Sequence, residues 1–443
     1  MGKRVAIAIA VGMLACAIAH AEPLRADDLA NKNEGGYVTG LPLAAYSTDL
    51  GFGGGARAYS YWNGERSDPR FVNTSYLARV FVQVFASTRG LQFHWLDLDL
   101  PKLASSPYRL RAQLIYARNI NNNYFGIGAR SLAHLQFPGS PAYASYSDYA
   151  TAERQVVNGT TYAKYNQYDL EKPAAIASLE RSFLDDRIRL LGGFGFSWAK
   201  LRDFTGTIVD AVGPSGQATT AVMNQTKLAE DCAAHAIVGC GGGRDDYLRL
   251  GISYDTRDYE PDPNRGVFLD AEVDLATVAL GSQFDYARGL VSARGYYSPA
   301  PGSADLVLAG RVTIVAQTNG APFFSMDTLP FTEDPRQGLG GHRTLRGYRQ
   351  DRFVGSVMTV ANAELRWTFG HATAWHQRFG FILVPFVDVG RVYDSLGELS
   401  LRRWRPSVGG ALRVAWNLAT LATIDYGISP EDAGLYINFN HIF

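Results

Sequence analysis

After its first 21 residues, the sequence contains no run of about 18 uncharged apolar residues, the length that a membrane-crossing helix needs. This absence excludes helical membrane spans, although hydrophobic residues make up 47% of the chain. The 42 basic and 42 acidic residues balance, so no excess of positive charge indicates a nucleic-acid partner. A membrane protein of this composition has to cross the bilayer as a closed β-barrel, because a barrel satisfies its backbone hydrogen bonds between strands.

The sequence also lacks the motifs of common hydrolytic chemistry. It contains neither the Gly-x-Ser-x-Gly of a nucleophile elbow nor the His-Glu-x-x-His of a zinc hydrolase. The segment Gly338–Gly341 is rich in glycine, but no strand-to-helix context surrounds it, so it does not indicate a dinucleotide site. We therefore expect no enzyme, no catalytic residue, no cofactor and no resident metal.

Cysteine is scarce, with three in the chain. Cys232 and Cys240 lie in one polar, Gly-rich segment, and Cys16 lies in an N-terminal segment that we expect to be removed. Because exported proteins meet an oxidising compartment, we predict a disulfide between Cys232 and Cys240. A metal site formed by this pair and His235 is the alternative, and it lacks a fourth obvious ligand.

Residues 1–21 have the order of a secretory signal peptide. Lys3 and Arg4 precede an apolar stretch over residues 5–19, and a small-x-small cleavage site ends at Ala21. A membrane anchor is one alternative, although the stretch is shorter than the about 20 residues of a helical span.

A lipoprotein signal at Cys16 is a second alternative, with a very short apolar core before it. After cleavage, residues 22–35 would form a short N-terminal extension. The composition is even over residues 36–443, which predicts one large domain.

Alternation of apolar and polar residues is the main secondary-structure signal, and it places one set of side chains on each face of a strand. In residues 187–198 one set is apolar and the other is polar or small. The apolar set comprises Ile188, Leu190, Phe194, Phe196 and Trp198. With 24 Tyr, 23 Phe and 46 Gly, the chain also has the aromatic and small residues that barrels use at their interfaces and bends.

A soluble β-sandwich would alternate too, with the apolar set hidden and the polar set in water. Long strands, aromatic residues at the ends of apolar stripes and the C-terminal segment favour the barrel. In that segment the apolar set is Leu435, Ile437, Phe439 and Phe443, which looks like the closing-strand signal by which outer-membrane proteins are recognised for insertion. His441 departs from this pattern, which prefers an apolar or aromatic residue there.

Turns between the alternating segments predict an all-β fold of sixteen antiparallel strands. We place them at approximately 51–62, 72–87, 91–100, 107–118, 119–130, 167–183, 187–201, 245–257, 266–278, 284–299, 304–318, 356–369, 379–394, 405–417, 419–429 and 434–443.

An even number of strands suits a bacterial single-chain barrel with both ends in the periplasm. The short connections are then predicted on the periplasmic side, at 87–90, 185–186 and 300–303. The long connections near 131–166, 202–244 and 319–355 are predicted outside. In strand 91–100 the apolar residues occupy odd positions up to Trp95 and even positions from Leu96, which predicts a β-bulge or an early strand end.

The segment from Gly338 to Gly355 resembles the lid-loop motif of the BamA/TamA superfamily of outer-membrane assembly and transport barrels, the bacterial surface antigen barrels. In that family a loop between the eleventh and twelfth strands folds back into the lumen, and its tip reads Val/Leu-Arg-Gly-Tyr/Phe. Here the tip is Leu345, Arg346, Gly347 and Tyr348. The predicted strand order places the loop 319–355 in the same interval.

Further segments follow in the family's order. Residues 362–366 read Asn-Ala-Glu-Leu-Arg, and the next strand carries Phe386, Asp388 and Gly390. Upstream, residues 255–266 resemble the family's turn before the second half of the barrel, and residues 41–55 resemble its first strand. The resemblance therefore covers residues 36–443.

The resemblance implies that Arg346, Glu364 and Asp388 form the lock that holds the lid. A buried arginine needs acidic partners, and its planar guanidinium can take both carboxylates, which alternation places on lumen faces. The alternative without a structural role is that Arg346 is an exposed cation in a loop. One family feature is missing, because residues 22–36 are too short for the periplasmic POTRA modules that dock substrates and partners in relatives.

The function implied is insertion or translocation of proteins, or of lipids, at the outer membrane of a Gram-negative bacterium. It would use a weak seam between the first and last strands, with Gly51–Gly55 and Asn438 and Asn440 shortening the pairing there. Implied partners are outer-membrane lipids, lipopolysaccharide and unfolded outer-membrane or secreted proteins; whether barrels associate as a homo-oligomer stays open. The alternative is a porin-like diffusion channel, which lumen arginines such as Arg109 and Arg249 would make anion-favouring.

Overall fold

The computed structural model describes residues 32–68, 70–71, 74, 76–258, 262–299, 305–329, 336–374, 377–416, 420–439 and 441–443. The predicted signal peptide lies outside these residues. No helix in these ranges is long and apolar enough to cross a membrane.

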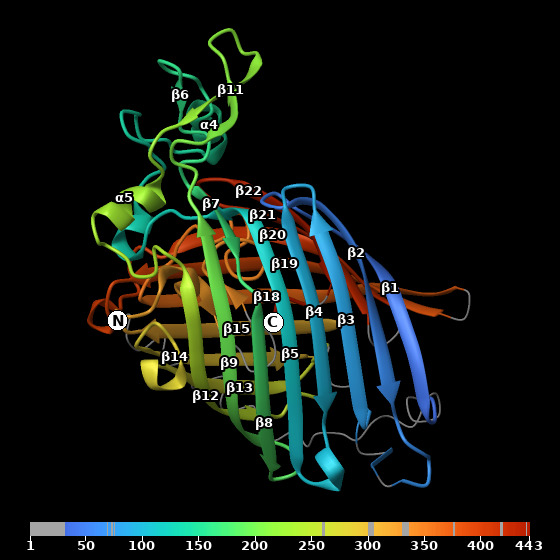
Figure 1. The fold of residues 1–443 in the computed structure, drawn as a ribbon. Coiled ribbons are helices and arrows are strands. Elements are labelled where there is room, and N and C mark those ends of the chain that lie inside the picture. The colour runs from blue at the N-terminus through green and yellow to red at the C-terminus, as the bar shows by residue number, and fades with distance from the viewer. Residues whose placement is uncertain are drawn as a thin grey trace.

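Sixteen antiparallel strands, formed by the described residues, close into one barrel (Figure 1). Each strand pairs with the next in chain order, and the last pairs with the first. The predicted fold class is therefore confirmed. The strands are β1 (Gly36–Ser47), β2 (Gly51–Trp62), β3 (Ala78–Ser87), β4 (Leu91–Leu100), β5 (Tyr108–Asn123), β7 with β8 (Gln167–Glu171 and Ala174–Phe183), β9 (Ile188–Arg202), β12 (Gly243–Asp255), β13 (Gly266–Ala276), β14 (Tyr286–Tyr297), β15 (Leu306–Gln317), β18 (Val357–Ala374), β19 (Gln377–Tyr393), β20 (Arg405–Trp416), β21 (Thr420–Ile428) and β22 (Ala433–Phe439).

We count β7 and β8 as one strand, because both pair with β5 on one side and with β9 on the other. The break falls at Lys172 and Pro173. Proline cannot donate to the hydrogen-bond ladder, so it interrupts the strand there.

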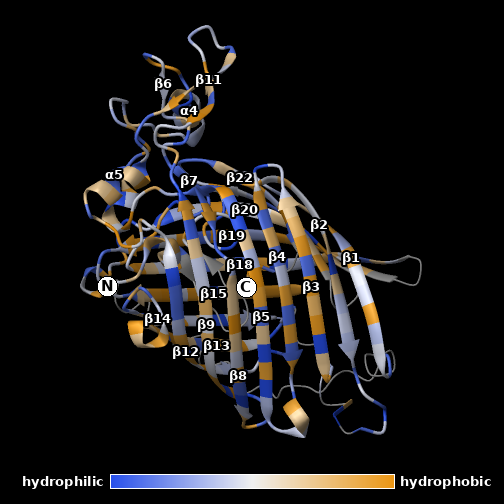
Figure 2. Ribbon diagram, in the orientation of Figure 1, coloured by the Kyte–Doolittle hydropathy of each residue, from blue (hydrophilic) through white to orange (hydrophobic). Residues whose placement is uncertain are grey.

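The barrel is apolar outside and polar inside, and Figure 2 shows the two kinds of residue alternating along its strands. On β9 the outward side chains of Leu190, Phe194 and Trp198 are 41–48% exposed. In contrast, the lumen-facing Arg249 and Ser253 of β12 are at most 9% exposed. A soluble sandwich would show the reverse pattern, so that alternative is wrong.

The predicted number of strands is right, but strands were assigned to the wrong residues in two places. Residues 107–118 and 119–130 form one strand, β5, rather than two. The strand β1 was not predicted. Because it adds one strand where the merged β5 removes one, the total is still sixteen. Its sequence contains Gly40 and Pro42, which weaken the strand signal, and proline is tolerated where a strand has a free edge.

Because β1 was not predicted, the connection between β3 and β4 was assigned to the wrong end of the barrel. We call the end of the barrel that carries the long connections the loop end, and the opposite end the turn end. Residues 88–90 lie at the loop end, where Arg89 donates to the backbone oxygen of Thr48 in the β1–β2 turn. The prediction that this connection is periplasmic is therefore wrong. Residues 184–187 do lie at the turn end, whereas residues 300–303 lie outside the described ranges.

The prediction of a β-bulge or an early end in β4 is wrong as well. The strand pairs with β5 in unbroken register from Leu91↔Asn119 to Leu100↔Leu110. The apolar residues change from odd to even positions because Phe93 and Trp95 face the lumen, where a barrel normally presents polar groups.

Two connections at the loop end fold together into a small domain, which we call the tower (residues 124–166 and 203–242; Figure 1). Its sheet joins both connections, since β11 pairs with β10 from its own connection and with β6 from the other. The predicted disulfide between Cys232 and Cys240 is present in the tower, so the metal alternative for these thiols is wrong. The tower contains η2 (Gly128–Leu132), α4 (Tyr146–Glu153), β6 (Thr160–Thr161), β10 (Ile208–Val212), β11 (Ala218–Met223) and α5 (Lys227–Ala233).

The remaining short elements lie in other connections. They are η1 (Leu103–Ser105), η3 (Val278–Leu280), α6 (Phe323–Met326), β16 (Thr328–Leu329), β17 (Arg336–Gln337) and η4 (Leu396–Glu398).

Candidate functional site

The connection between β15 and β18, the eleventh and twelfth strands, enters the barrel from the loop end. From β17 onward, residues 338–356 run through the lumen, and we call this segment the lumen loop. Its apolar side chains Leu339, Leu345, Tyr348 and Phe353 are at most 2% exposed. They pack against inward-facing residues of β14, β15, β18 and β19. This packing anchors the loop to one wall of the barrel.

At the tip of the lumen loop, Arg346 is fully buried. Its Nε and Nη2 donate to both oxygens of Asp388, each over 2.9 Å. Its Nη1 donates to Oε1 of Glu364 over 3.0 Å. The guanidinium also stacks over the ring of Phe386, with its carbon 3.3 Å from the ring centroid. The structure thus brings together Arg346, Glu364, Asp388 and Phe386.

A third carboxylate meets the same guanidinium and was not predicted. Nη1 of Arg346 also donates to Oδ1 of Asp425 on β21, over 3.0 Å. The alternation of β21 could have revealed this residue, because Ile424, Tyr426 and Ile428 face outward and leave Asp425 on the lumen side. Three buried carboxylates therefore surround Arg346.

These carboxylates are shared with further cations of the barrel wall. Arg413 binds both oxygens of Glu364, over 2.7 and 2.9 Å, and Arg366 donates to Oε2 of Glu364 over 3.0 Å. Asn362 donates to Asp388 over 2.7 Å. Three carboxylates thus face the three guanidinium groups of Arg346, Arg366 and Arg413, so the formal charges of this buried cluster balance.

Glycines make room for the tip. Gly347 adopts φ 96°, a left-handed conformation that other residues rarely adopt. On the wall, a Cβ atom at Gly390 would lie 3.2 Å from the side chain of Leu345. Next to the tip, Tyr348 is buried and its ring lies edge-on to Phe353 with centroids 5.1 Å apart.

Arg349, three residues after the tip, contacts both sides of the junction between the first and last strands. Its Nη1 donates to the backbone oxygen of Thr48 in the β1–β2 turn over 2.9 Å. Its Nε lies 2.8 Å from Oδ2 of Asp432, in the turn between β21 and β22. The lumen loop therefore connects the two hairpins that meet at the junction.

The junction of β1 and β22 is short, and we call it the seam. Only Tyr46↔Ile437 and Ser47↔Tyr436 are paired across it in the described residues. In comparison, β1 pairs with β2 along its whole length from Gly36 to Ser47. The rest of β1 thus presents an edge without a strand partner among these residues.

The last strand ends earlier than predicted. β22 stops at Phe439, and residues 441–443 leave the barrel wall and lie in the lumen. Phe443 packs against Tyr296, and the backbone oxygens of Ile442 and Phe443 accept from Arg311 and Arg366. The predicted strand 434–443 is therefore too long, because these inward contacts replace pairing with β1. Asn440 lies outside the described residues, so its predicted part in the seam is not described.

The glycines predicted at the seam lie one strand away from it. Gly51–Gly55 belong to β2, not to the first strand. A Cβ atom at Gly53 would lie 2.1 Å from the ring of Phe85, so the small residue makes room for that ring. This glycine therefore relieves crowding between neighbouring strands and does not weaken the seam directly.

A closed barrel of sixteen strands with an apolar outer face and a polar lumen defines an integral outer-membrane β-barrel of a Gram-negative bacterium. The sequence matches the family described as the Omp85 superfamily domain over residues 118–440. The chain belongs to this superfamily, which confirms the predicted BamA/TamA-type relationship and the outer-membrane localisation. Residues 14–77 also match a domain of unknown function, DUF5982.

Individual relatives agree with this assignment. The chain is 27% identical over 184 residues to the outer membrane protein assembly factor BamA of Nitratidesulfovibrio vulgaris, a match over 37% of this chain and 21% of the relative. The chain thus spans about a fifth of that relative's length.

Solved structures share the fold at low sequence identity. BamA from Haemophilus ducreyi lacking POTRA domains 1–3 superposes with a TM-score of 0.53 and 14% identity, over 92% of this chain and 70% of that one. CdiB from Escherichia coli gives a TM-score of 0.52 and 10% identity, over 91% of this chain and 62% of that one.

Proposed function

We propose that this barrel inserts or translocates proteins at the outer membrane by opening its seam. The observation that carries the proposal is the short pairing of β1 with β22, which among the described residues comprises Tyr46↔Ile437 and Ser47↔Tyr436. A free strand edge is a template for pairing with another chain. An unfolded strand of a client protein could therefore add to β1.

The lumen loop supports this proposal, because it acts as a lid that is locked by Arg346, Glu364 and Asp388. Breaking a buried ion cluster leaves uncompensated charges, so the lock resists release of the lid. In this proposal, Arg349 links lid and seam. Outer-membrane lipids and lipopolysaccharide surround the seam, and unfolded outer-membrane or secreted proteins are its clients.

A porin-like channel is the competing proposal, and the lumen arginines support it poorly. Arg109 binds Asp99 through two hydrogen bonds, and Arg249 binds Asp274 in the same way. A cation that is already paired with a carboxylate attracts a passing anion only weakly, so these arginines do not support the anion preference expected from the sequence.

A disulfide across the seam tests the proposal. Cysteines in place of Tyr46 and Ile437 would join β1 to β22 at an existing pair. Cysteines in place of Ile424 and Ile437 give a matched control, because this pair joins β21 to β22 within the barrel wall. Both variants are compared for insertion of a client barrel into liposomes, before and after reduction, alongside the unmodified chain.

We expect the seam disulfide to stop client insertion and reduction to restore it, whereas the control disulfide leaves insertion unchanged. Full insertion activity with the seam joined would exclude the proposal. A large, steady ion conductance in the unmodified protein would favour the channel instead.

A further inference from the structure

Two adjoining cavities lie inside the barrel at its loop end, beside the lumen loop. Their volumes are about 310 and 340 Å³, within the range of about 300–1,000 Å³ typical of small-molecule sites. Both are lined by Leu50, Leu91, Phe93, Trp95 and Gln350, so they share the wall formed by β4.

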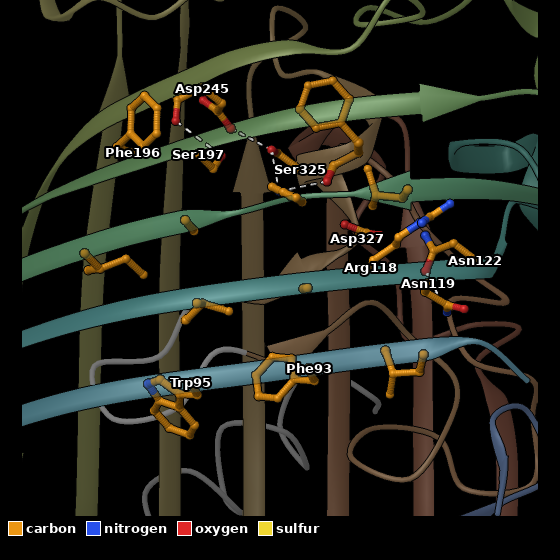
Figure 3. A pocket seen from close by; sticks show the side chains of 18 of the residues that line it. Phe93, Trp95, Arg118, Asn119, Asn122, Phe196, Ser197, Asp245, Ser325 and Asp327 are labelled. Carbon is orange, nitrogen blue, oxygen red and sulfur yellow. Dashed lines mark hydrogen bonds between the residues drawn. The ribbon is translucent and has the colours of Figure 1, made fainter. Parts of the chain in front are cut away.

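This shared wall is apolar, although barrel lumens are normally polar. The apolar lining continues from β4 onto neighbouring strands, with Leu43 and Phe85 beside the second cavity and Ile115 beside the first. We call the whole lining the apolar wall, and its residues are Leu43, Phe85, Leu91, Phe93, Trp95 and Ile115. Figure 3 shows Phe93 and Trp95 next to each other along one strand, facing the cavity. An apolar surface of this kind favours a ligand that brings hydrocarbon to it.

The polar groups across the first cavity are engaged with one another. Asp245 accepts from Ser325 over 2.6 Å and from Tyr286 over 3.0 Å, as Figure 3 shows for Ser325. Lys172 donates to Ser325 and to the backbone oxygen of Phe324. Because these groups satisfy each other, they do not favour a ligand that needs many hydrogen bonds, such as a sugar.

Arg57 of β2 lines the second cavity. Its guanidinium donates to Oε1 of Gln83 over 2.7 and 3.2 Å and to the hydroxyl of Tyr59 over 3.4 Å. In the part of the chain that the structure describes, it has no carboxylate partner, whereas Arg79 and Arg109 each bind an aspartate. A half-buried positive charge beside an apolar wall complements an anionic head group.

We propose that the two cavities bind one acyl-chain amphiphile with an anionic head group. The head group pairs with Arg57, and the chain lies along the apolar wall into the cavity beside Ile115. The second cavity is also lined by Tyr46 and Ser47 of β1 and by Tyr436 of β22, so it reaches the seam. Binding at this site does not require the seam to open for protein clients.

Fluorescence quenching of Trp95 tests the site. The probe is a brominated fatty acid, used at about pH 8.5 so that its carboxylate is ionised, with the full-length protein in lipid nanodiscs. Outward tryptophans such as Trp198 are quenched from the bilayer, so the signal of Trp95 is taken as the difference between the protein and its Trp95→Phe variant. The corresponding brominated fatty alcohol serves as the uncharged probe.

Two substitutions on β5 form a matched pair. Ala117→Phe fills the cavity from the lumen side, and Ala112→Phe adds the same ring on the outer face. A third variant, Arg57→Gln, removes the charge without filling space, and heat-modifiability on gels shows that each variant is folded.

We expect saturable quenching of Trp95 by the fatty acid, tighter by about fourfold for each added methylene that enters the cavity. Arg57→Gln should weaken it about tenfold or more, Ala117→Phe should abolish it, and Ala112→Phe should leave it unchanged. No quenching of Trp95, or equal quenching in both β5 variants, would overturn the site. Equal binding of acid and alcohol, unaffected by Arg57→Gln, would overturn the anionic head group.

Discussion

Gly347 at the tip of the lumen loop lies backbone to backbone against Gly427 of β21. A Cβ atom at Gly427 would lie 2.7 Å from the carbonyl carbon of Arg346, and a Cβ atom at Gly347 would lie 2.8 Å from the carbonyl carbon of Gly427. This approach sets how deeply the tip reaches into the lumen, and with it the distance from Arg346 to its three carboxylates.

Replacing Gly427 by Ala should therefore push the tip off the wall. Overpacking of this kind costs about 1–3 kcal/mol, which urea titration of the detergent-folded barrel would measure as a lower free energy of unfolding. Gly410→Ala on β20 is the matched control, because a Cβ atom there has nothing within 4 Å. Equal stability of the two variants would contradict the close packing of the tip.

Replacing Arg346 by Ala should destabilise the folded barrel and release the lumen loop. The change leaves Glu364, Asp388 and Asp425 buried without their shared cation, and breaking such a cluster costs about 3–5 kcal/mol. We expect a lower folded yield and a higher conductance in planar bilayers. Arg346→Lys should give an intermediate result, because a single ammonium cannot replace the planar fork that spans the carboxylates.

Replacing Arg349 by Ala should loosen the seam at the loop end. Arg349 contacts Thr48 on one side of the seam and Asp432 on the other, so its loss should speed hydrogen exchange at Ser47 and Ile437. Arg89→Ala is the matched control, since Arg89 donates to the same oxygen of Thr48 but, in the described part of the chain, makes no hydrogen bond or ion pair with the β21–β22 turn. If both variants exchange at the same rate, Arg349 does not couple the loop to the seam.

The tower should lose stability as the pH rises. Burial raises the pKa of Glu153 in α4 to about 8, from an ordinary value near 4.5. Its folded form therefore binds a proton more tightly than its unfolded form, so this stabilisation is complete below about pH 4.5 and is lost by about pH 8. Glu153→Gln should remove this dependence, and limited proteolysis of the tower between pH 5 and 8 would show it. An unchanged pH profile in the variant would contradict a neutral Glu153.

Replacing both Cys232 and Cys240 by Ser should affect the tower and spare the barrel. The disulfide closes a short loop with a sequence separation of 8, for which loop entropy predicts about 2–3 kcal/mol. We expect faster proteolysis within residues 203–242, while the heat-modifiability of the barrel on gels stays the same. Loss of barrel folding would mean that the tower is needed for assembly.

The sequence predicted the barrel well because period-2 alternation is a direct consequence of strand geometry. Strands such as β9 carry a strong alternation and were placed to within a few residues. β1 was missed because Gly40 and Pro42 lower its strand propensity. What makes this segment a strand is its pairing with β2, which the local sequence does not reveal. The long β5 was divided because its second half, rich in asparagine, has no apolar set to mark a strand.

The site was predicted in part, for similar reasons. Arg346, Glu364 and Asp388 came from a motif whose residues lie in a recognisable order, whereas Asp425 belongs to no such motif and required the register of β21. Residues 441–443 were expected in the wall because Phe443 belongs to the apolar set of the closing strand, although His441 departs from it. Their inward position depends on Arg311 and Arg366, which are remote in sequence and could not be inferred from the pattern.

The tower has a practical consequence for work in living cells. The turn between β10 and β11 leaves residues 214–217 exposed at the loop end, which faces the medium in an outer-membrane barrel. A peptide epitope inserted beside Ser215 would be displayed to antibodies on intact bacteria, so correctly assembled molecules could be counted one cell at a time without breaking the envelope.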